Sequence, residues 1–295
     1  MITPDIAYQA CRFLHDTSLM LLWGCSAFLS VLASASISRR VWPKFTGFVL
    51  AAVIVAILTT AIALPLQTGI IGNGWVDTVN PATIHDVLFD TTAGRAWQVQ
   101  AVTNFFLLLA FLAPRHLRPA ALALTAGLGL ASLTLTGHAA MHQGWFGFAH
   151  RLNDIVHLLA AGSWFGALVP LLPILRLLEV EECRRDAGRA LKRFSNIGHA
   201  AVALVILSGL INTALILGRL PTNWASPYQA MLAFKIAVVT CMTMLAIINR
   251  YVFVPRIGRQ PQRALAAIRT GTIVEIALGI VAIACVAVFG MLEPA

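Results

Sequence analysis

Charged residues are scarce in this sequence of 295 amino acids: they make up 11%, while hydrophobic residues make up 59% and the mean hydropathy is +0.81. Soluble globular chains carry about 25% charged residues, so this composition excludes an ordinary soluble fold. Five widely scattered cysteines exclude a disulfide-stapled secreted module. Repeats, low-complexity tracts and linkers are also lacking, which predicts a single membrane domain over 1–295.

Long apolar runs are abundant instead. A helix needs about 20 apolar residues to cross a hydrocarbon core of about 30 Å, where no water satisfies loose backbone groups. Eight runs qualify and predict an all-α polytopic membrane protein, with eight transmembrane helices in one bundle at 13–36, 46–66, 96–113, 119–138, 149–175, 194–217, 229–249 and 269–291. An extracytoplasmic loop is expected near 67–95, with a short helix from Asn80-Pro81 through Leu88.

The basic residues indicate the orientation of these helices. The chain has 21 Lys and Arg against 12 Asp and Glu, and sixteen of the basic residues fall in alternate connections near 39–44, 115–118, 176–193 and 250–269. Lys and Arg collect in cytoplasmic loops. Both termini are therefore predicted on the periplasmic side of a bacterial cytoplasmic (inner) membrane. The net charge of +9 is explained by topology, and we expect no nucleic-acid partner.

Ionisable residues inside the apolar runs are the strongest functional signal, because each costs about 2.5–3.5 kcal/mol to insert. Successive residues of a helix are rotated by 100°, and on the fifth run several polar residues lie within about 100° of one another. They form one polar stripe in the outer half of the membrane, consisting of His150, Asn153, Asp154 and His157.

Histidines from three segments are expected at one outer depth: His15, His138, His142, His150 and His157. His138 and His142 would stand at i and i+4, with the Met141 thioether beside them, provided that the helix continues past Gly137. Imidazole binds copper, zinc, iron and nickel, and a thioether suits Cu(I). We therefore predict a transition-metal site. The alternative is that these histidines are interfacial and bind headgroups, water and backbone without any metal.

Other ionisable residues are assigned supporting roles. Asp16 or Asp154 would accept the second N–H of a ligating histidine and fix its tautomer. Lys235 should lie at the same depth and pair with one of these aspartates, unless it snorkels to the outer headgroups. In the inner third, His199 and Glu275 are expected to form a structural pair, and the alternative is the inner end of an ion path.

Several segments carry a family resemblance. The segment 157–168 is similar to a His-Leu, Trp-x-Gly, Leu pattern, and within it Gly162 and Gly166 form a GxxxG step that predicts close helix packing. Segments 193–195 and 208–212, and the Thr-x-x-Gly-x-x-Trp lead at 91–97, complete the similarity. Together they resemble the CopD family of inner-membrane copper-resistance proteins. The resemblance implies passage of copper ion across the membrane, often with a periplasmic copper-binding protein of the CopC type, here as a separate chain.

The expected function is therefore copper homeostasis, without enzymatic activity. The protein would bind copper through the outer histidines and move it across, or deliver it at, the membrane. The alternative is an electron-transfer protein that holds haem b between His157 and either His15 or His138. A third hypothesis is a metal-free protein whose histidines sense pH. A hydrolase is not expected, because one helix cannot bring Ser163, Asp154 and His157 into relay geometry.

Overall fold

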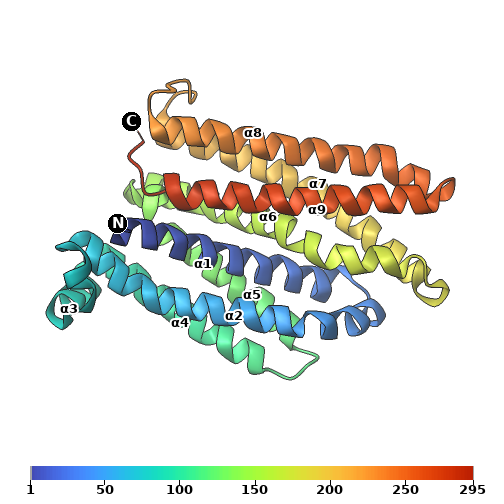
Figure 1. Ribbon diagram of the computed structural model, residues 1–295, viewed down its shortest axis with the longest axis horizontal. Helices are drawn as coiled ribbons and strands as arrows, with labels where there is room; N and C mark the ends of the chain where they lie inside the picture. The colour runs from blue at the N-terminus through green and yellow to red at the C-terminus, as the bar shows by residue number, and fades with distance from the viewer. Residues whose placement is uncertain (1, 295) are drawn as a thin grey trace.

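The computed structural model describes residues 2–294, except for the side chain of Ala139. All regular structure in that part is helical, and the long helices lie side by side along the long axis of one bundle (Figure 1). The all-α prediction is confirmed. Six helices of the described chain are long and apolar enough to cross a membrane.

Each of the eight apolar runs overlaps one long helix. These helices are α1 (Pro4–Ala27), α2 (Ala35–Ile71), α4 (Thr92–Leu112), α5 (Arg118–Ser132), α6 (Gly144–Leu177), α7 (Glu181–Leu217), α8 (Pro227–Ile248) and α9 (Pro261–Phe289). The π-helices are η1 (Phe28–Leu32) and η5 (Asn249–Phe253), and the 3-10 helices are η2 (Gly74–Val79), η3 (Leu133–Leu135), η4 (Gly137–Ala140) and η6 (Val254–Gly258). Helices α1 and α4 are not among these six spans and carry more polar residues.

The fourth run ends earlier than predicted. Helix α5 stops at Ser132, Thr136 is extended, and Gly137 has a φ of +70°, a left-handed conformation that favours glycine. His138 therefore lies in the 3-10 turn η4, and His142 follows that turn. The expected helical i, i+4 relation of the two histidines is wrong, because the glycine turns the chain before either of them.

The connection between α2 and α4 contains the predicted short helix, α3 (Pro81–Asp90). Asn80 caps it, because its side-chain oxygen accepts a hydrogen bond from the backbone N–H of Ala82 at 3.1 Å. The loop is shorter than predicted, since α2 continues to Ile71 and α4 begins at Thr92. Figure 1 shows α3 at the same end of the bundle as both termini.

Asp77 organises the turn before α3. Its Oδ2 accepts hydrogen bonds from the backbone N–H of Asn73 at 2.6 Å and from the Asn73 amide at 3.0 Å. The backbone N–H of Asn73 is the main reason why the pKa of Asp77 lies below its ordinary value. The carboxylate therefore stabilises the turn above the pKa it has in the unfolded chain, and this contribution is lost as pH falls through the folded pKa.

Asp77→Asn is expected to speed proteolytic cleavage between α2 and α3 at neutral pH, because the variant side chain loses the charge that holds Asn73. Limited proteolysis of the full-length protein at neutral and acidic pH measures this. The difference from wild type should shrink in acid, where the wild-type carboxylate is protonated. Asp86→Asn, at an exposed position on α3, is the control. Equal cleavage of wild type and Asp77→Asn at neutral pH would contradict the assignment.

Helix α1 lies at the centre of the bundle and packs against α2, α5, α6 and α9. It crosses α6 at backbone distance: a Cβ atom at Gly24 would collide with the carbonyl oxygen of Gly162 and would lie 2.6 Å from the Cα of Gly166. The indole of Trp23 also donates a hydrogen bond to the carbonyl of Leu159 at 2.9 Å. The prediction of close packing at the GxxxG step is confirmed.

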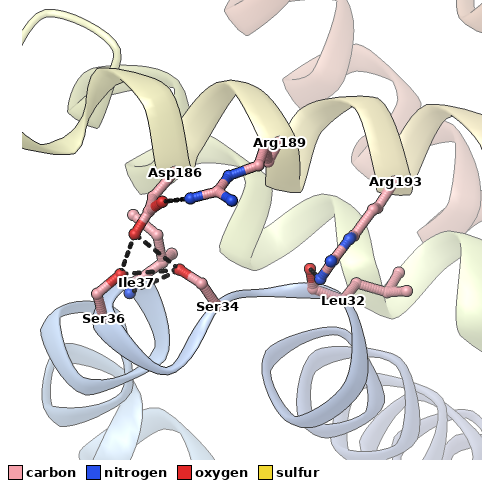
Figure 2. A network of polar contacts seen from close by, with 7 residues as sticks. All are labelled: Leu32, Ser34, Ser36, Ile37, Asp186, Arg189 and Arg193. Carbon is pink, nitrogen blue, oxygen red and sulfur yellow. Dashed lines mark hydrogen bonds and ion pairs between the residues drawn. The ribbon is translucent and has the colours of Figure 1, made fainter.

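At the end opposite the termini, a polar network fastens the corner between α1 and α2 to α7 (Figure 2). Asp186 of α7 accepts hydrogen bonds from Ser36 and from Ser34, the latter at 3.2 Å, and pairs with Arg189. Arg193 donates to the last carbonyl of η1 at 3.3 Å. This corner is held from both sides, whereas the backbones of α7 and α8 come close to each other at few points.

Candidate functional site

A cavity of about 480 Å³ lies among α1, α6, α7, α8 and α9, where the backbones of α7 and α8 are apart. Its wall is mainly apolar. Three of the five candidate histidines and all three residues expected to support them contribute to this wall: His138, His150, His157, Asp16, Asp154 and Lys235. Of the polar stripe predicted on the fifth run, His150, Asp154 and His157 therefore face one shared space, while Asn153 bonds to α7.

His142 and His150 form the closest pair of imidazoles. Their Nδ1 atoms are 3.0 Å apart, so one ring donates a hydrogen bond to the other. His150 is only 1% exposed, and its Nε2 is buried without a hydrogen-bond partner within residues 2–294. The Nε2 of His138 is also buried and unpartnered there, and its ring packs edge-on against Tyr228. Such orphaned nitrogens are costly, and a bound cation would satisfy them.

His157 lies two turns further along α6. Its Nδ1 is 2.9 Å from the Oγ of Ser208, and that hydroxyl donates its hydrogen to the carbonyl of Leu204. Nδ1 must therefore carry the proton of the neutral imidazole, which leaves the lone pair on Nε2. A histidine in this tautomer is ready to bind a metal, and the hydroxyl plays the orienting role that we expected of an aspartate.

His15 has the same arrangement on α1. Its Nδ1 is 3.0 Å from the Oγ1 of Thr59, which donates to the carbonyl of Val55 at 2.7 Å, so the lone pair is again on Nε2. That Nε2 has no partner in the part of the chain described. His15 lies in a separate hollow of about 50 Å³ and does not line the main cavity, while Arg12 and Asp16 line both spaces.

Asp154 is held by amides. Asn212 of α7 donates to its Oδ1 at 2.8 Å, and Asn153 donates to the Oδ1 of Asn212 at 2.6 Å. Lys235 of α8 lies over the ring of Phe289, with Nζ 5.7 Å from the centroid, and no carboxylate oxygen of residues 2–294 lies within 4.0 Å of it. The expected direct ion pair does not form. Asp154 of α6 and Lys235 of α8 both line the cavity, where they lie more than 4.0 Å apart.

The predicted pair of His199 and Glu275 is wrong. His199 is exposed on α7, and its Nε2 is 3.1 Å from the hydroxyl of Tyr251. Glu275 is 3% exposed on α9 and accepts a hydrogen bond from the Asn249 amide at 2.9 Å. The two side chains contact different residues of η5, Tyr251 and Asn249, and do not contact each other.

The five candidate histidines do not form one cluster. No three His, Cys, Asp or Glu side chains of the described chain are grouped so that they could hold a metal ion. The early end of α5 places His138 and His142 beside His150, the spacing along α6 sets His157 two turns away, and α1 turns His15 into its own hollow. The structure thus separates the five histidines into three places.

Sequence reasoning missed several partners of these residues. Ser208 and Asn212, which hold His157 and Asp154, lie in a segment that carried the family resemblance, and no role was assigned to them. Arg12 stands four residues before Asp16, a helical spacing that signals a shared face, and both line the two hollows. Thr59 gave no signal, because a threonine in an apolar run is common.

Together, the long apolar helices and the cavity among them define a multi-pass helical membrane protein with a few polar side chains in a mainly apolar cavity. Comparison with known proteins is more specific. The N-terminal domain profile described as copper resistance protein D-like matches residues 1–148, and the profile described as copper resistance protein D matches residues 188–289. The chain belongs to the copper resistance protein D family, as the resemblance predicted.

Two curated relatives match over nearly the whole chain, and a third matches over part of it. Inner membrane protein YebZ of Escherichia coli (strain K12) is 33% identical, over 97% of this chain and 97% of that protein. Copper resistance protein D of Pseudomonas syringae pv. tomato is 30% identical, over 97% of this chain and 96% of that protein. Copper transport protein CutJ of Bacillus subtilis (strain 168) is 30% identical over 65% of this chain and 37% of that protein. No solved structure matches the chain significantly. The protein is a multi-pass inner-membrane protein.

Proposed function

We propose that this protein is a copper homeostasis protein that captures copper at His138, His142 and His150 and passes it to His157, moving it across the membrane or delivering it at the outer side. The observation that carries this proposal is that histidines from the η4 turn and from α6 meet at one cavity, with buried, unpartnered Nε2 atoms on His138 and His150. The copper names of the family and of two of its relatives support copper as the substrate.

The orientation is part of this proposal: all eight long helices cross the membrane, with both termini periplasmic. Both termini and α3 lie at one end of the bundle (Figure 1). The four connections rich in Lys and Arg join the helices at the other end, which the positive-inside rule makes cytoplasmic. The histidine turn at 137–143 then faces the periplasm, where a separate CopC-type protein would deliver copper.

Capture requires a small rearrangement. The Nδ1 atoms of His142 and His150 are 3.0 Å apart, too close to hold copper between them. The segment that carries His138 and His142 is flanked by Gly137 and Gly144, both with positive φ, and Met141 within it is 49% exposed. We infer that this turn opens to let a soft cation in. His157 would accept the ion next, about 10 Å further along α6 at 1.5 Å per residue.

Few ligands at each step suit transport, because a site that hands an ion on must bind it weakly enough to release it. Met242 lines the same cavity further along and adds a thioether beyond His157. His15, in its own hollow, would hold copper apart from this route.

The haem alternative is separated from copper binding by one experiment. The purified, full-length protein is incubated with Cu(I) under reducing conditions, and its copper content and visible spectrum are measured. We expect bound copper and no Soret band. His15 and His157 line different hollows, which argues against an iron held between them, and the matched family and two of the relatives are named for copper. A Soret band without copper would overturn the proposal.

Ser208→Ala is expected to weaken Cu(I) binding by about 10-fold or more, because partners that orient a metal-binding histidine contribute 10–100-fold to affinity in comparable sites. Competition with a chromophoric Cu(I) chelator measures this affinity. Thr213→Ala is the matched control: Thr213 lies on the same helix and the same cavity, but its hydroxyl donates only to the carbonyl of Gly209. Unchanged affinity in Ser208→Ala would remove His157 from the ligand set.

A further inference from the structure

Glu275 is a buried acid that the proposed copper route does not use. It lies fourteen residues before Phe289, the last residue of α9, which corresponds to roughly 21 Å at 1.5 Å per residue. In a hydrocarbon core of about 30 Å this places the carboxyl in the inner third. Its side chain is 3% exposed. Acids at such positions are costly, and they are usually functional.

The groups that contact this carboxyl are neutral. The Asn249 amide donates to Oε1 at 2.9 Å, and the Trp164 side chain provides a second hydrogen-bonding contact. Helices α1, α6 and α8 with η5 and η6 pack against α9, and none of them brings a charged group onto the carboxyl. Within residues 2–294, no Lys, Arg or His nitrogen lies within 4.0 Å of it. An ionised carboxylate here would be a buried charge without a counterion.

Two local features position the amide. Asn249 is the first residue of the π-helix η5, a widened turn of a kind that is frequent at functional sites. Gly271, one turn before Glu275 on α9, leaves space for the Asn249 side chain, because a Cβ atom at that glycine would lie 2.6 Å from the amide oxygen. The contact between Asn249 and Glu275 therefore depends on the π-helix of one element and the glycine of the other.

Glu275 also lies between the cavity and the basic end of the bundle. Trp164, which contacts it on one side, is part of the cavity wall. On the other side, Asn249 leads through η5 and η6 to the connection that carries Arg250, Arg256 and Arg259. A carboxyl group in this position can respond to a cation in the cavity and exchange a proton with the compartment at the basic end of the bundle.

We propose that Glu275 is a proton-binding site, which is occupied in the metal-free protein and exchanges its proton with the cytoplasm past Asn249. A neutral carboxyl satisfies the amide and the indole without the cost of an unpaired buried charge. The inference deepens the proposed function, and the coupling of proton release to copper rests on that function. A cation that reaches the cavity beside Trp164 favours the ionised form of Glu275, and the proton then leaves to cytoplasmic water.

Infrared difference spectroscopy of the reconstituted, metal-free protein tests proton binding without copper. We expect the C=O stretching band of a protonated carboxyl at neutral pH, complete loss of that band in Glu275→Gln, and no loss in Asp86→Asn, which replaces an exposed acid. Asn249→Leu and Gly271→Ala keep the acid but remove or displace the amide, and both should shift the frequency of the band. A wild-type spectrum without a band that responds to these variants would overturn the inference.

The side of exchange is measured in vesicles that hold the protein in one orientation. The band should follow the pH of the compartment facing the connection at 254–260, and a band that follows only the other compartment would refute cytoplasmic exchange. Copper content distinguishes the two proposals. A titrating band in a protein that binds no copper defeats the proposed function alone, whereas bound copper without the band defeats the proton site alone.

Discussion

His157→Ala is expected to lower Cu(I) affinity by more than about 100-fold, because it removes a ligand, whereas partners of a ligand contribute 10–100-fold. His157 lines the cavity, its tautomer leaves Nε2 free, and it is the deepest histidine on the α6 face. Copper content and chelator competition on the purified protein measure the loss.

The control for this variant is His199→Ala, which removes an exposed imidazole that bonds Tyr251 and lies outside the cavity. Its affinity should equal that of wild type. Thermal unfolding of the two metal-free variants serves to check that each of them is folded. Equal copper binding by wild type and His157→Ala would defeat the assignment of His157, and equal losses in the two variants would show that the effect is unspecific.

Gly166→Val is expected to destabilise the bundle by about 3 kcal/mol or more, at the upper end of overpacking effects. A Cβ atom at this position would collide with the carbonyl oxygen of Met20 and lie 2.8 Å from the Cα of Gly24. Both obstacles are backbone atoms of α1, so no side-chain rotation relieves the clash. Helix α1 would have to move away from α6, and the cavity wall that it contributes would move with it.

Thermal unfolding of the protein in detergent measures this effect. Gly198→Ala is the matched control, because Gly198 lies within α7 and a Cβ atom there would meet nothing within 4 Å. Alanine stabilises a helix interior relative to glycine, so this control should melt no lower than wild type. A Gly166→Val protein that also melts like wild type would show that the crossing of α1 and α6 is looser than the structure indicates.

The helices could be predicted because long apolar runs in a membrane have few alternatives to an α-helix. The shared face of His150, Asp154 and His157 was also predictable, since it follows from helical geometry within one segment. Arrangements between segments were not. Depth along the membrane is predicted from position in a run, but the rotation of each helix is set by packing. This is why His199 and Glu275, which were expected at one depth, contact different partners.

The cluster at the outer end shows a second limit. The left-handed backbone at Gly137, five residues after α5 ends at Ser132, turns the chain so that His142 lies against His150. A glycine inside an apolar run is usually tolerated in a helix, so the sequence alone did not reveal this turn. Likewise, the rotation of α1 that separates His15 from the other histidines depends on contacts with Thr59, far away in the sequence.

The hydroxyl groups of Thr59 and Ser208 have an electrostatic consequence. Each hydroxyl fixes the imidazole hydrogen on Nδ1, so an ion that binds Nε2 of His15 or His157 displaces no proton. The full charge of the ion is therefore added to the low-dielectric interior. The carboxyl groups of Asp16 and Asp154, which line these hollows, would offset that charge when ionised. Since the electrostatic self-energy of an ion grows with the square of its charge, these neutral imidazoles suit a monovalent cation better than a divalent one.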